Sequence, residues 1–309
     1  MTPVAALKMR VKRSVEKRLD RAASAYLDDS ALARVDFSRP AGEAALSPPT
    51  SVSWRVFKNP VTLFIGGVTA VLLEFAEPRV RSGVWDHSTF RIDPVRRMKR
   101  TGLAAMVTVY GPRSVSEQMI EAVSRRHARV AGVTPSGQPY AASDPDLLSW
   151  VQATAAYGFM ESYSAYAVPL DEEARDRSYR DGRRAALLYG AARAPTSVAE
   201  QRAFFAEMRD RLEASPILFE FLDIMRHAPA LPYPAQLAQG LLVRAAVDLV
   251  PREIREITGL GERYGLKPFE KLIVRRMARR ADRLLLRSSP PAQACLRLGL
   301  PEDYLYDRR

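Results

Sequence analysis

The sequence contains very little cysteine and histidine. Cys295 is the only cysteine in 309 residues, and the histidines are His87, His127 and His227. A single thiol excludes both an intramolecular disulfide and a thiolate metal cluster, and it is typical of a reducing compartment. None of the histidines has a second ligand at the local spacing HxxxH or HxxE. A histidine-based metal site would therefore need ligands that the fold brings together, or a cofactor that requires one imidazole.

Long hydrophobic runs are absent as well. The longest run, residues 61–73, ends at Glu74 and is too short to span a bilayer, so it predicts a buried helix. Inside it, Gly66 and Gly67 would let a neighbouring helix approach closely. Residues 1–17 lack the apolar core of a signal peptide. No GxSxG, Walker or GxGxxG motif follows a predicted strand. The predicted location is the cytoplasm.

Positive charge is concentrated near the two ends of the chain. The formal net charge is +12, and residues 1–22 and 270–287 each carry seven Lys or Arg against two acids. These two segments therefore supply most of the net charge. Aromatic residues do not alternate with the arginines, as a platform for single-stranded nucleic acid would require, so nucleic acid is not the expected partner.

Both basic segments also carry an apolar stripe at helical spacing. One stripe runs from Val4 to Tyr26, and the other comprises Ile273, Met277, Ala281 and Leu284–Leu285. Basic amphipathic helices bind anionic bilayers, which predicts a peripheral association with the inner face of the membrane. The alternative is that both stripes pack on the domain and the charges are only solvated.

The apolar residues recur at helical spacing almost throughout. No convincing alternation of polar and apolar residues predicts a strand, so we expect an all-α fold with one multi-helix globular domain. The expected parts are a basic N-terminal helix, a linker rich in Pro, Ser, Ala and Gly, the main helical domain, and a basic C-terminal helix with its tail packed on or beside it: 1–35, 36–54, 55–260 and 261–309. Later helices are expected at about 171–190, 197–213, 216–227, 234–248, 251–258 and 267–287.

Three helix starts have clear capping signals. Asp93-Pro94 and Asp144-Pro145 each place an N-cap before a proline in the first turn. The second of these predicts a helix that runs towards Tyr166. Ser114 and Glu117 have the spacing of a capping box directly after a Gly-Pro break.

Two neighbouring helices carry the candidate binding residues. On the helix predicted from Ser114, His127 shares an apolar face with Met119, Ile120, Val123 and Val130. Such an imidazole is either a hydrogen-bonded core residue or a ligand. On the preceding helix, Arg97, Arg100 and Thr101 lie on one face because they are three and four residues apart. If that face points inward, its charges need an anionic partner.

A series of positions forms a pattern of its own across this region. The positions are Gly83-Val84, His87-Ser88, Phe90, Asp93-Pro94, Arg97, Thr101, Gly111, His127, Val130, Gly132, Gly137, Tyr140, Ala142, Asp144-Pro145, Trp150-Val151 and Ala153-Thr154, followed later by Leu249–Leu260. In order and spacing, this series resembles the catalytic domain of latex-clearing rubber oxygenases and MpaB-type oxygenases. The resemblance covers about residues 55–260.

The resemblance implies a helical fold that holds a b-type haem. Such a protein would use O₂ to cleave a carbon–carbon double bond of an isoprenoid or other apolar lipid substrate. The family's proximal haem ligand falls on His127, which would bind the iron. Its distal basic residue and the adjacent threonine fall on Arg100 and Thr101, with a further arginine at Arg97. The arginines would anchor propionates or polarise bound O₂, and Thr101 would donate a hydrogen bond.

The chain departs from its relatives at three positions. Rubber oxygenases tend to have lysine where this chain has Arg100, and arginine does not ligate iron as a neutral amine does. Many relatives carry histidine at the positions of Glu77 and Gln152. If those histidines serve the chemistry, this chain has altered or lost it, although one axial histidine suffices for haem.

Three functions are therefore open at this point. The first is a haem-dependent oxygenase that acts on an apolar alkene. The second is a non-catalytic haem- or lipid-binding protein at a membrane surface. The third is a helical interaction protein without a ligand. A Soret band in the absorbance spectrum would exclude the third, and O₂-dependent product formation would separate the first two.

Overall fold

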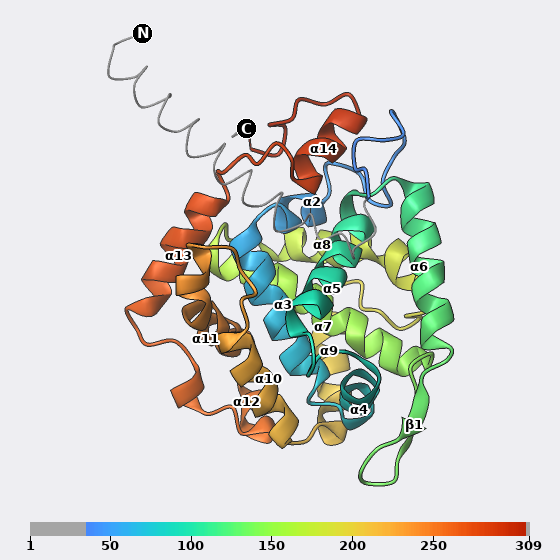
Figure 1. The fold of residues 1–309 in the computed structure, drawn as a ribbon, viewed down its shortest axis with the longest axis vertical. Helices are drawn as coiled ribbons and strands as arrows, with labels where there is room; N and C mark the ends of the chain where they lie inside the picture. The colour runs from blue at the N-terminus through green and yellow to red at the C-terminus, as the bar shows by residue number, and fades with distance from the viewer. Residues whose placement is uncertain (1–34, 307–309) are drawn as a thin grey trace.

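The computed structural model describes residues 35–306 and confirms the all-α fold (Figure 1). The basic segment 1–22 and its stripe from Val4 to Tyr26 lie outside the described residues. The α-helices are α2 (Val52–Phe57), α3 (Pro60–Glu74), α4 (Pro78–His87), α5 (Pro94–Tyr110), α6 (Arg113–His127), α7 (Pro145–Tyr166), α8 (Glu172–Leu188), α9 (Val198–Met208), α10 (Pro216–His227), α11 (Gln239–Leu249), α12 (Arg252–Thr258), α13 (Glu270–Ala281) and α14 (Pro290–Arg297).

Helices α3 and α7 cross at the centre of the molecule. They approach so closely that a Cβ atom added to Gly66 would lie 2.8 Å from the carbonyl oxygen of Gly158. A Cβ atom on Gly158 would lie 2.5 Å from the carbonyl oxygen of Gly66. The apolar run predicted as a buried helix is α3, and its glycines allow the close approach as expected.

The other helices surround this central pair. Helices α11 and α13 pack on α3, with α10 against α11, and α8 packs on α7 and α2. Helices α5 and α6 pack on each other, and α5 also contacts α2 and α14 (Figure 1). The main core includes a cluster of four aromatic rings between α3, α4 and α10 with centroids 5.3 to 6.3 Å apart: Phe75, Trp85, Phe90 and Phe221.

Two of the three predicted helix caps are confirmed. The side chain of Asp93 accepts a hydrogen bond from the backbone N–H of Arg96, and that of Asp144 accepts from Asp146. The capping box at Ser114 is wrong. Helix α6 begins one residue earlier, and the N–H and hydroxyl of Ser114 both donate to the carboxylate of Glu43. A partner distant in the sequence has replaced the local one.

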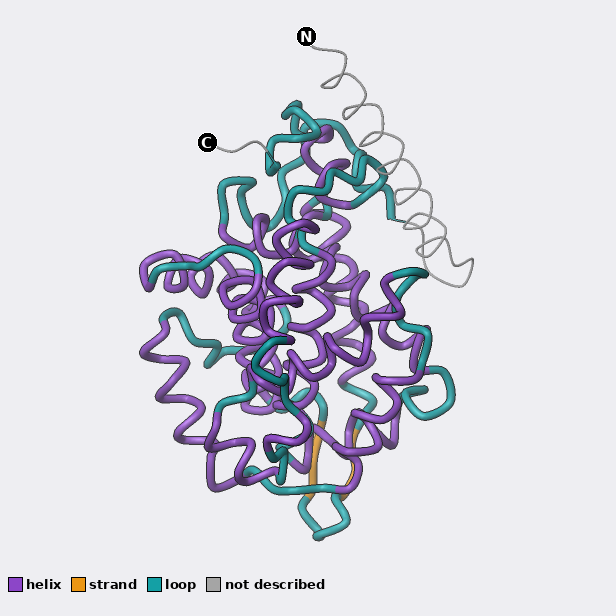
Figure 2. The backbone as a smooth tube through the Cα atoms, turned by 90° about the vertical axis from the view of Figure 1, so that its left-hand side faces the viewer, coloured by secondary structure: helices purple, strands orange, loops and turns teal. Residues whose placement is uncertain are grey.

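Most of the later helices were predicted within a few residues. Helix α10 has the expected bounds, whereas α9 and α11 are shorter because 3₁₀ turns, η1 (Arg209–Arg211) and η2 (Ala235–Ala238), take over part of each predicted range. The prediction missed a small hairpin of β1 (Ala131–Val133) and β2 (Pro139–Ala141), seen at the lower end of the molecule in Figure 2. Strands of three residues are too short for alternation to be recognised.

The segment expected to be a linker packs into the domain. It is irregular up to residue 51, but Phe37 and Ala45 are buried, and α2 already begins at Val52. The guanidinium of Arg297, at the end of α14, donates to the carbonyl oxygens of Phe37, Glu43 and Tyr110 at 2.6 to 2.8 Å. These bonds tie the beginning of the described chain to its end.

Helix α13 is rotated relative to the predicted apolar stripe. Val274 and Ala278 are its fully buried residues on the apolar side, whereas Ile273 is 45% exposed. Polar contacts fix this rotation, since Asn59 donates to the Ala278 carbonyl at 2.9 Å and Arg275 donates to that of Ala165 at 3.1 Å. The alternative that the whole stripe packs on the domain therefore does not hold at Ile273.

No single helix among residues 35–306 is long and apolar enough to cross a membrane. Helices α3 and α4 meet that requirement only as a pair, and they are bent by 113° relative to each other.

Candidate functional site

His127 ends helix α6 and is half-buried. Its helix presents Ile120 to the interior, while Arg125, Arg126 and Arg129 are exposed, so the predicted faces of this helix are confirmed. Burial lowers the pKa of His127, and the charge of Arg97 lowers it further. Neither ring nitrogen makes a hydrogen bond with a residue that the structure describes. At neutral pH the side chain is therefore a neutral imidazole with free nitrogen atoms, the form in which histidine binds metals.

Arg97 and Thr101 interact directly on helix α5. The guanidinium Nη1 of Arg97 donates to Thr101 Oγ1, which itself donates to the Arg97 carbonyl at 3.1 Å. The guanidinium carbon lies 5.8 Å from the ring centroid of Phe90. Burial lowers the pKa of Arg97, and the charge of Glu74 opposes that shift. Arginine remains charged at neutral pH, so this is a half-buried cation.

Glu74, the last residue of helix α3, faces the same region. Burial raises the pKa of its carboxyl group to about 7, and the charge of Arg97 acts in the opposite direction. The carboxyl group makes no hydrogen bond or ion pair with any residue in the described part of the chain. Near neutral pH it is therefore present in both protonation states and can give or take a proton.

Arg97 is the common electrostatic neighbour of the other two groups. Its charge acts on Glu74 from α3 and on His127 from α6, so three helices bring an acid, a cation and an imidazole into one region. Other residues cover this part of α5 only partly, because no side chain from Pro94 to Met106 is buried. We call Glu74, Arg97, Thr101 and His127 the three-helix site.

Arg100 lies at the edge of this site. Its side chain is exposed and makes no ion pair with a described residue, although its charge lowers the pKa of Arg97. The sequence placed it on the same face as Arg97 and Thr101. In the structure its guanidinium is free to bind an anion at the surface.

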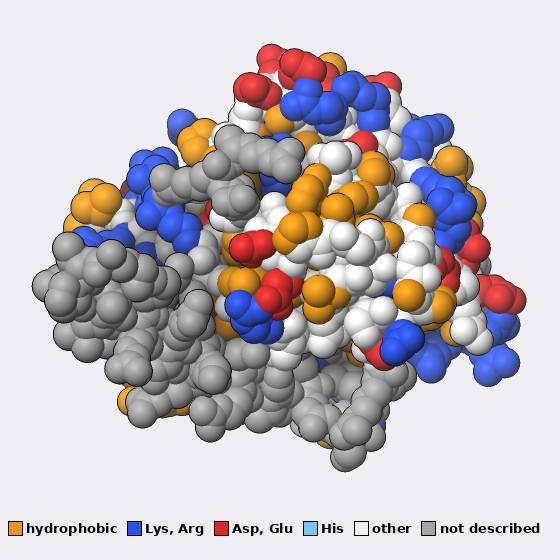
Figure 3. All heavy atoms as spheres, turned by 90° about the horizontal axis from the view of Figure 1, so that it is seen from above, with side chains coloured by type: hydrophobic (Ala, Val, Ile, Leu, Met, Phe, Trp, Pro, Cys, Tyr) orange, Lys and Arg blue, Asp and Glu red, His pale blue; other side chains and the backbone are white. Residues whose placement is uncertain are grey.

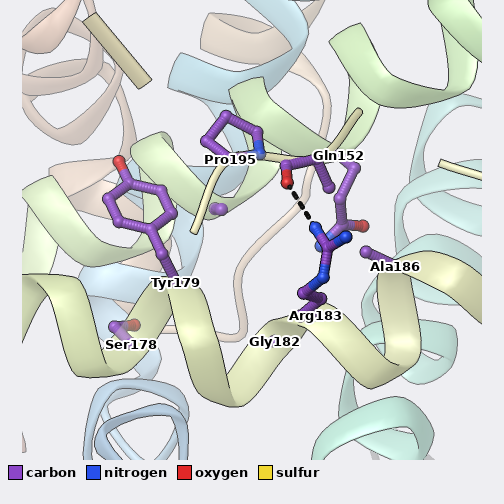
Figure 4. A pocket seen from close by; sticks show the side chains of 9 residues that line it. Gln152, Ser178, Tyr179, Gly182, Arg183, Ala186 and Pro195 are labelled. Carbon is purple, nitrogen blue, oxygen red and sulfur yellow. Dashed lines mark hydrogen bonds between the residues drawn. The ribbon is translucent and has the colours of Figure 1, made fainter. Parts of the chain in front are cut away.

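Glu77 and Gln152, which the resemblance singled out as departures, lie in different surroundings. The Glu77 carboxylate is buried and caps α4, accepting from the Val80 N–H at 2.8 Å and from Arg79 Nε at 2.7 Å. Gln152 lines a small pocket between α7 and α8, beside Tyr179 and Arg183 (Figure 4). The free volume of that pocket is about 20 Å³, enough for one or two water molecules and too little for a substrate.

Clustered metal ligands do not occur between residues 35 and 306. No group of three or more His, Cys, Asp or Glu side chains there is arranged to hold a metal ion. His87 instead bonds to the hydroxyl of Tyr140 at 3.1 Å, and the ring Nδ1 of the exposed His227 lies 2.9 Å from the Asp223 carbonyl oxygen. Of the three histidines, only His127 has both ring nitrogens free of described partners.

The fold and the three-helix site define an all-helical protein in which a half-buried acid, arginine and imidazole lie in one region. A family model described as ER-bound oxygenase mpaB/B'/rubber oxygenase, catalytic domain, matches residues 54–301. The chain therefore belongs to this family of oxygenase catalytic domains, as the residue pattern indicated. The match extends beyond residue 260 and includes α13 and α14. No curated protein and no solved structure matches the chain.

Sequence reasoning missed Glu74. In the sequence this residue is recognisable only as the end of the longest apolar run. The available signal was a lone charged residue on a helix that is otherwise uncharged. Its importance depends on the proximity of Arg97, which lies on another helix and is not evident from local spacing.

Proposed function

We propose that the protein is a haem-dependent oxygenase that uses O₂ to oxidise or cleave a double bond of an apolar isoprenoid or lipid. The observation that carries this proposal is His127, a neutral imidazole whose ring nitrogens bind no described residue and which lies near the half-buried Arg97. An axial histidine is a common ligand of haem iron, and nearby cations suit the anionic propionates. The residues present therefore fit the group.

In this proposal His127 holds the iron, and Arg97 or Arg100 holds the propionates. The haem, when bound, supplies the O₂ chemistry. Thr101 orients the Arg97 guanidinium through their mutual hydrogen bonds. The Glu74 carboxyl, with a pKa near neutrality, holds or releases a proton at its Oε atoms as charge changes around it.

The first test compares wild-type protein and His127→Ala after reconstitution with haem. We expect a Soret band for the wild type and loss of bound haem in the variant. The loss of one half-buried imidazole should lower the free energy of unfolding by only about 1 kcal/mol, so the variant should remain helical. His87→Ala is the matched control and should retain haem. Equal haem content in all three proteins would refute the ligand assignment.

The second candidate is a haem- or lipid-binding protein without turnover. The observation that favours it is the commitment of Glu77 to the α4 cap, at a position where relatives carry histidine. Incubation of the reconstituted protein with squalene under air and under argon distinguishes the two functions. Oxygen-dependent cleavage products support the oxygenase, whereas retained haem without products supports the binding protein.

A further inference from the structure

The outward face of helix α13 combines apolar and cationic side chains. At the beginning of the helix, Phe269, Leu272 and Ile273 are 64, 72 and 45% exposed. Further along the same face, and continuing past the helix end, lie four exposed arginines: Arg276, Arg279, Arg280 and Arg283. We call these seven residues the α13 face. In Figure 3, lysine and arginine side chains lie at several places on the surface, among them the side of the molecule where α13 lies in Figure 1.

The acids of this segment do not neutralise the arginines. Glu270 is buried and paired with Arg244 at 2.5 Å, and Asp282 is paired with Lys58 at 3.2 Å. The four arginines of the α13 face have no ion pair or hydrogen bond with any residue between 35 and 306. Their charges are therefore available to an external anion.

The fold holds the α13 face outward. The opposite side of the helix is anchored by the buried Val274 and Ala278 and by the hydrogen bond from Asn59 to the Ala278 carbonyl. The helix therefore cannot turn to bury Phe269 and Leu272 without breaking these contacts. Exposed large apolar residues in a fixed position next to cations indicate an interaction surface.

We propose that the α13 face binds an anionic lipid bilayer. Phe269, Leu272 and Ile273 would enter the boundary between headgroups and acyl chains, while the arginines bind lipid phosphates. Charge complementarity requires an anionic partner, and the three exposed apolar side chains favour a bilayer over nucleic acid. The proposal is independent of the haem chemistry, since none of these residues belongs to the three-helix site.

The experiment is sedimentation of the full chain with vesicles of phosphatidylcholine alone or mixed in equal parts with phosphatidylglycerol. We expect binding to the mixed vesicles that weakens as salt is added. Arg276→Gln/Arg280→Gln should weaken it by about thirtyfold, because each arginine near an anionic surface contributes about a factor of five. Phe269→Ser/Leu272→Ser should weaken it by about tenfold, through loss of apolar burial.

Matched variants control for charge and for surface polarity. Arg209→Gln/Arg211→Gln removes the same charge from η1, and Leu187→Ser removes an exposed leucine from α8, so both should bind like the wild type. Equal binding by all variants, or equal binding to neutral vesicles, would overturn the proposal. So would retention on duplex DNA that depends on Arg276 and Arg280 in a protein that does not bind vesicles.

A fluorescent variant locates the contact. Native Trp54, Trp85 and Trp150 are buried, so Phe269→Trp would add an exposed indole. Its emission should shift to the blue with mixed vesicles and be quenched by brominated lipid. An unshifted spectrum for protein that sediments with the vesicles would show that another surface binds, which contradicts the proposal.

Discussion

At the scale of single residues, the carboxyl group of Glu74 makes stability depend on pH near neutrality. Burial raises its pKa from 4.5 to about 7 in the folded state. The folded protein therefore holds this proton more tightly than the unfolded chain, and this group makes stability fall as the pH rises from about 4.5 through about 7. Above that range the destabilisation is constant.

We therefore expect Glu74→Gln to stabilise the haem-free protein at high pH. Gln has a similar shape and no charge to desolvate, so the gain should be small at about pH 5 and up to about 3 kcal/mol at about pH 8. Urea unfolding at both pH values measures it. Glu253→Gln, at an exposed position on α12, is the control and should change little at either pH. A gain that did not increase with pH would contradict the assignment of this pKa.

The arginines of the site should matter more for ligand retention than for folding. Partial burial of the Arg97 cation is costly, because no carboxylate between residues 35 and 306 forms a close ion pair with it. We expect Arg97→Met/Arg100→Met to weaken haem retention while thermal stability stays similar or rises. Haem titration and thermal unfolding of the same preparations measure both effects. Unfolding of the variant without a change in haem affinity would instead identify these residues as structural.

At the scale of elements, the helix caps show which signals are local. Asp144 binds the N–H groups of its own first turn, whereas Ser114 binds Glu43. We expect Asp144→Ala to lower the free energy of unfolding by about 1 kcal/mol, the typical contribution of an N-cap. Ser114→Ala should lower it by less than about 0.5 kcal/mol, because its side-chain bond is exposed. Chemical denaturation compares the two, and a larger loss for Ser114→Ala would contradict the observed capping.

The same distinction explains how much the sequence could predict. Asp93, Asp144 and the bounds of α10 followed from neighbours within one turn, and the face of α6 followed from spacing. The rotation of α13 depends on Asn59, and the role of Glu74 depends on Arg97; both partners lie far away in the sequence. Spacing along one helix contains no information about such partners. The residue pattern nevertheless identified the family, because it extends over many elements at once.

The crossing of α3 and α7 gives a further prediction at this scale. A Cβ atom on Gly158 would meet the backbone of Gly66 at 2.5 Å, and backbone cannot move aside as a side chain can. We expect Gly158→Ala to lower the free energy of unfolding by about 1–3 kcal/mol through overpacking. Gly182→Ala, on α8, has no atom within 4 Å of the added Cβ and should raise it by up to about 1 kcal/mol. Thermal unfolding measures both, and equal effects would argue against the close crossing.

At the scale of the whole molecule, the three-helix site depends on two helices that the core holds at few residues, away from the site. Val107, Val109 and Tyr110 anchor the end of α5, while its first turns carry the arginines and are half-covered. Helix α6 is likewise buried mainly at Ser116 and Ile120. The central pair α3 and α7 supplies the rigid part, including Glu74. The site therefore joins one well-packed helix to two loosely packed ones.

The hydrogen bonds of the Arg297 guanidinium couple local unfolding at the two ends of the described chain. It joins Phe37 and Glu43 near the start of the described chain to α14 near its end, and the Arg297 carbonyl accepts in return from the Gly42 N–H at 2.7 Å. Local unfolding of the segment that contains Phe37 and Glu43 must break the same hydrogen bonds to Arg297 as local unfolding of α14. Amide hydrogens in both segments should therefore exchange with solvent through one shared opening, and a protease would find the two ends susceptible together.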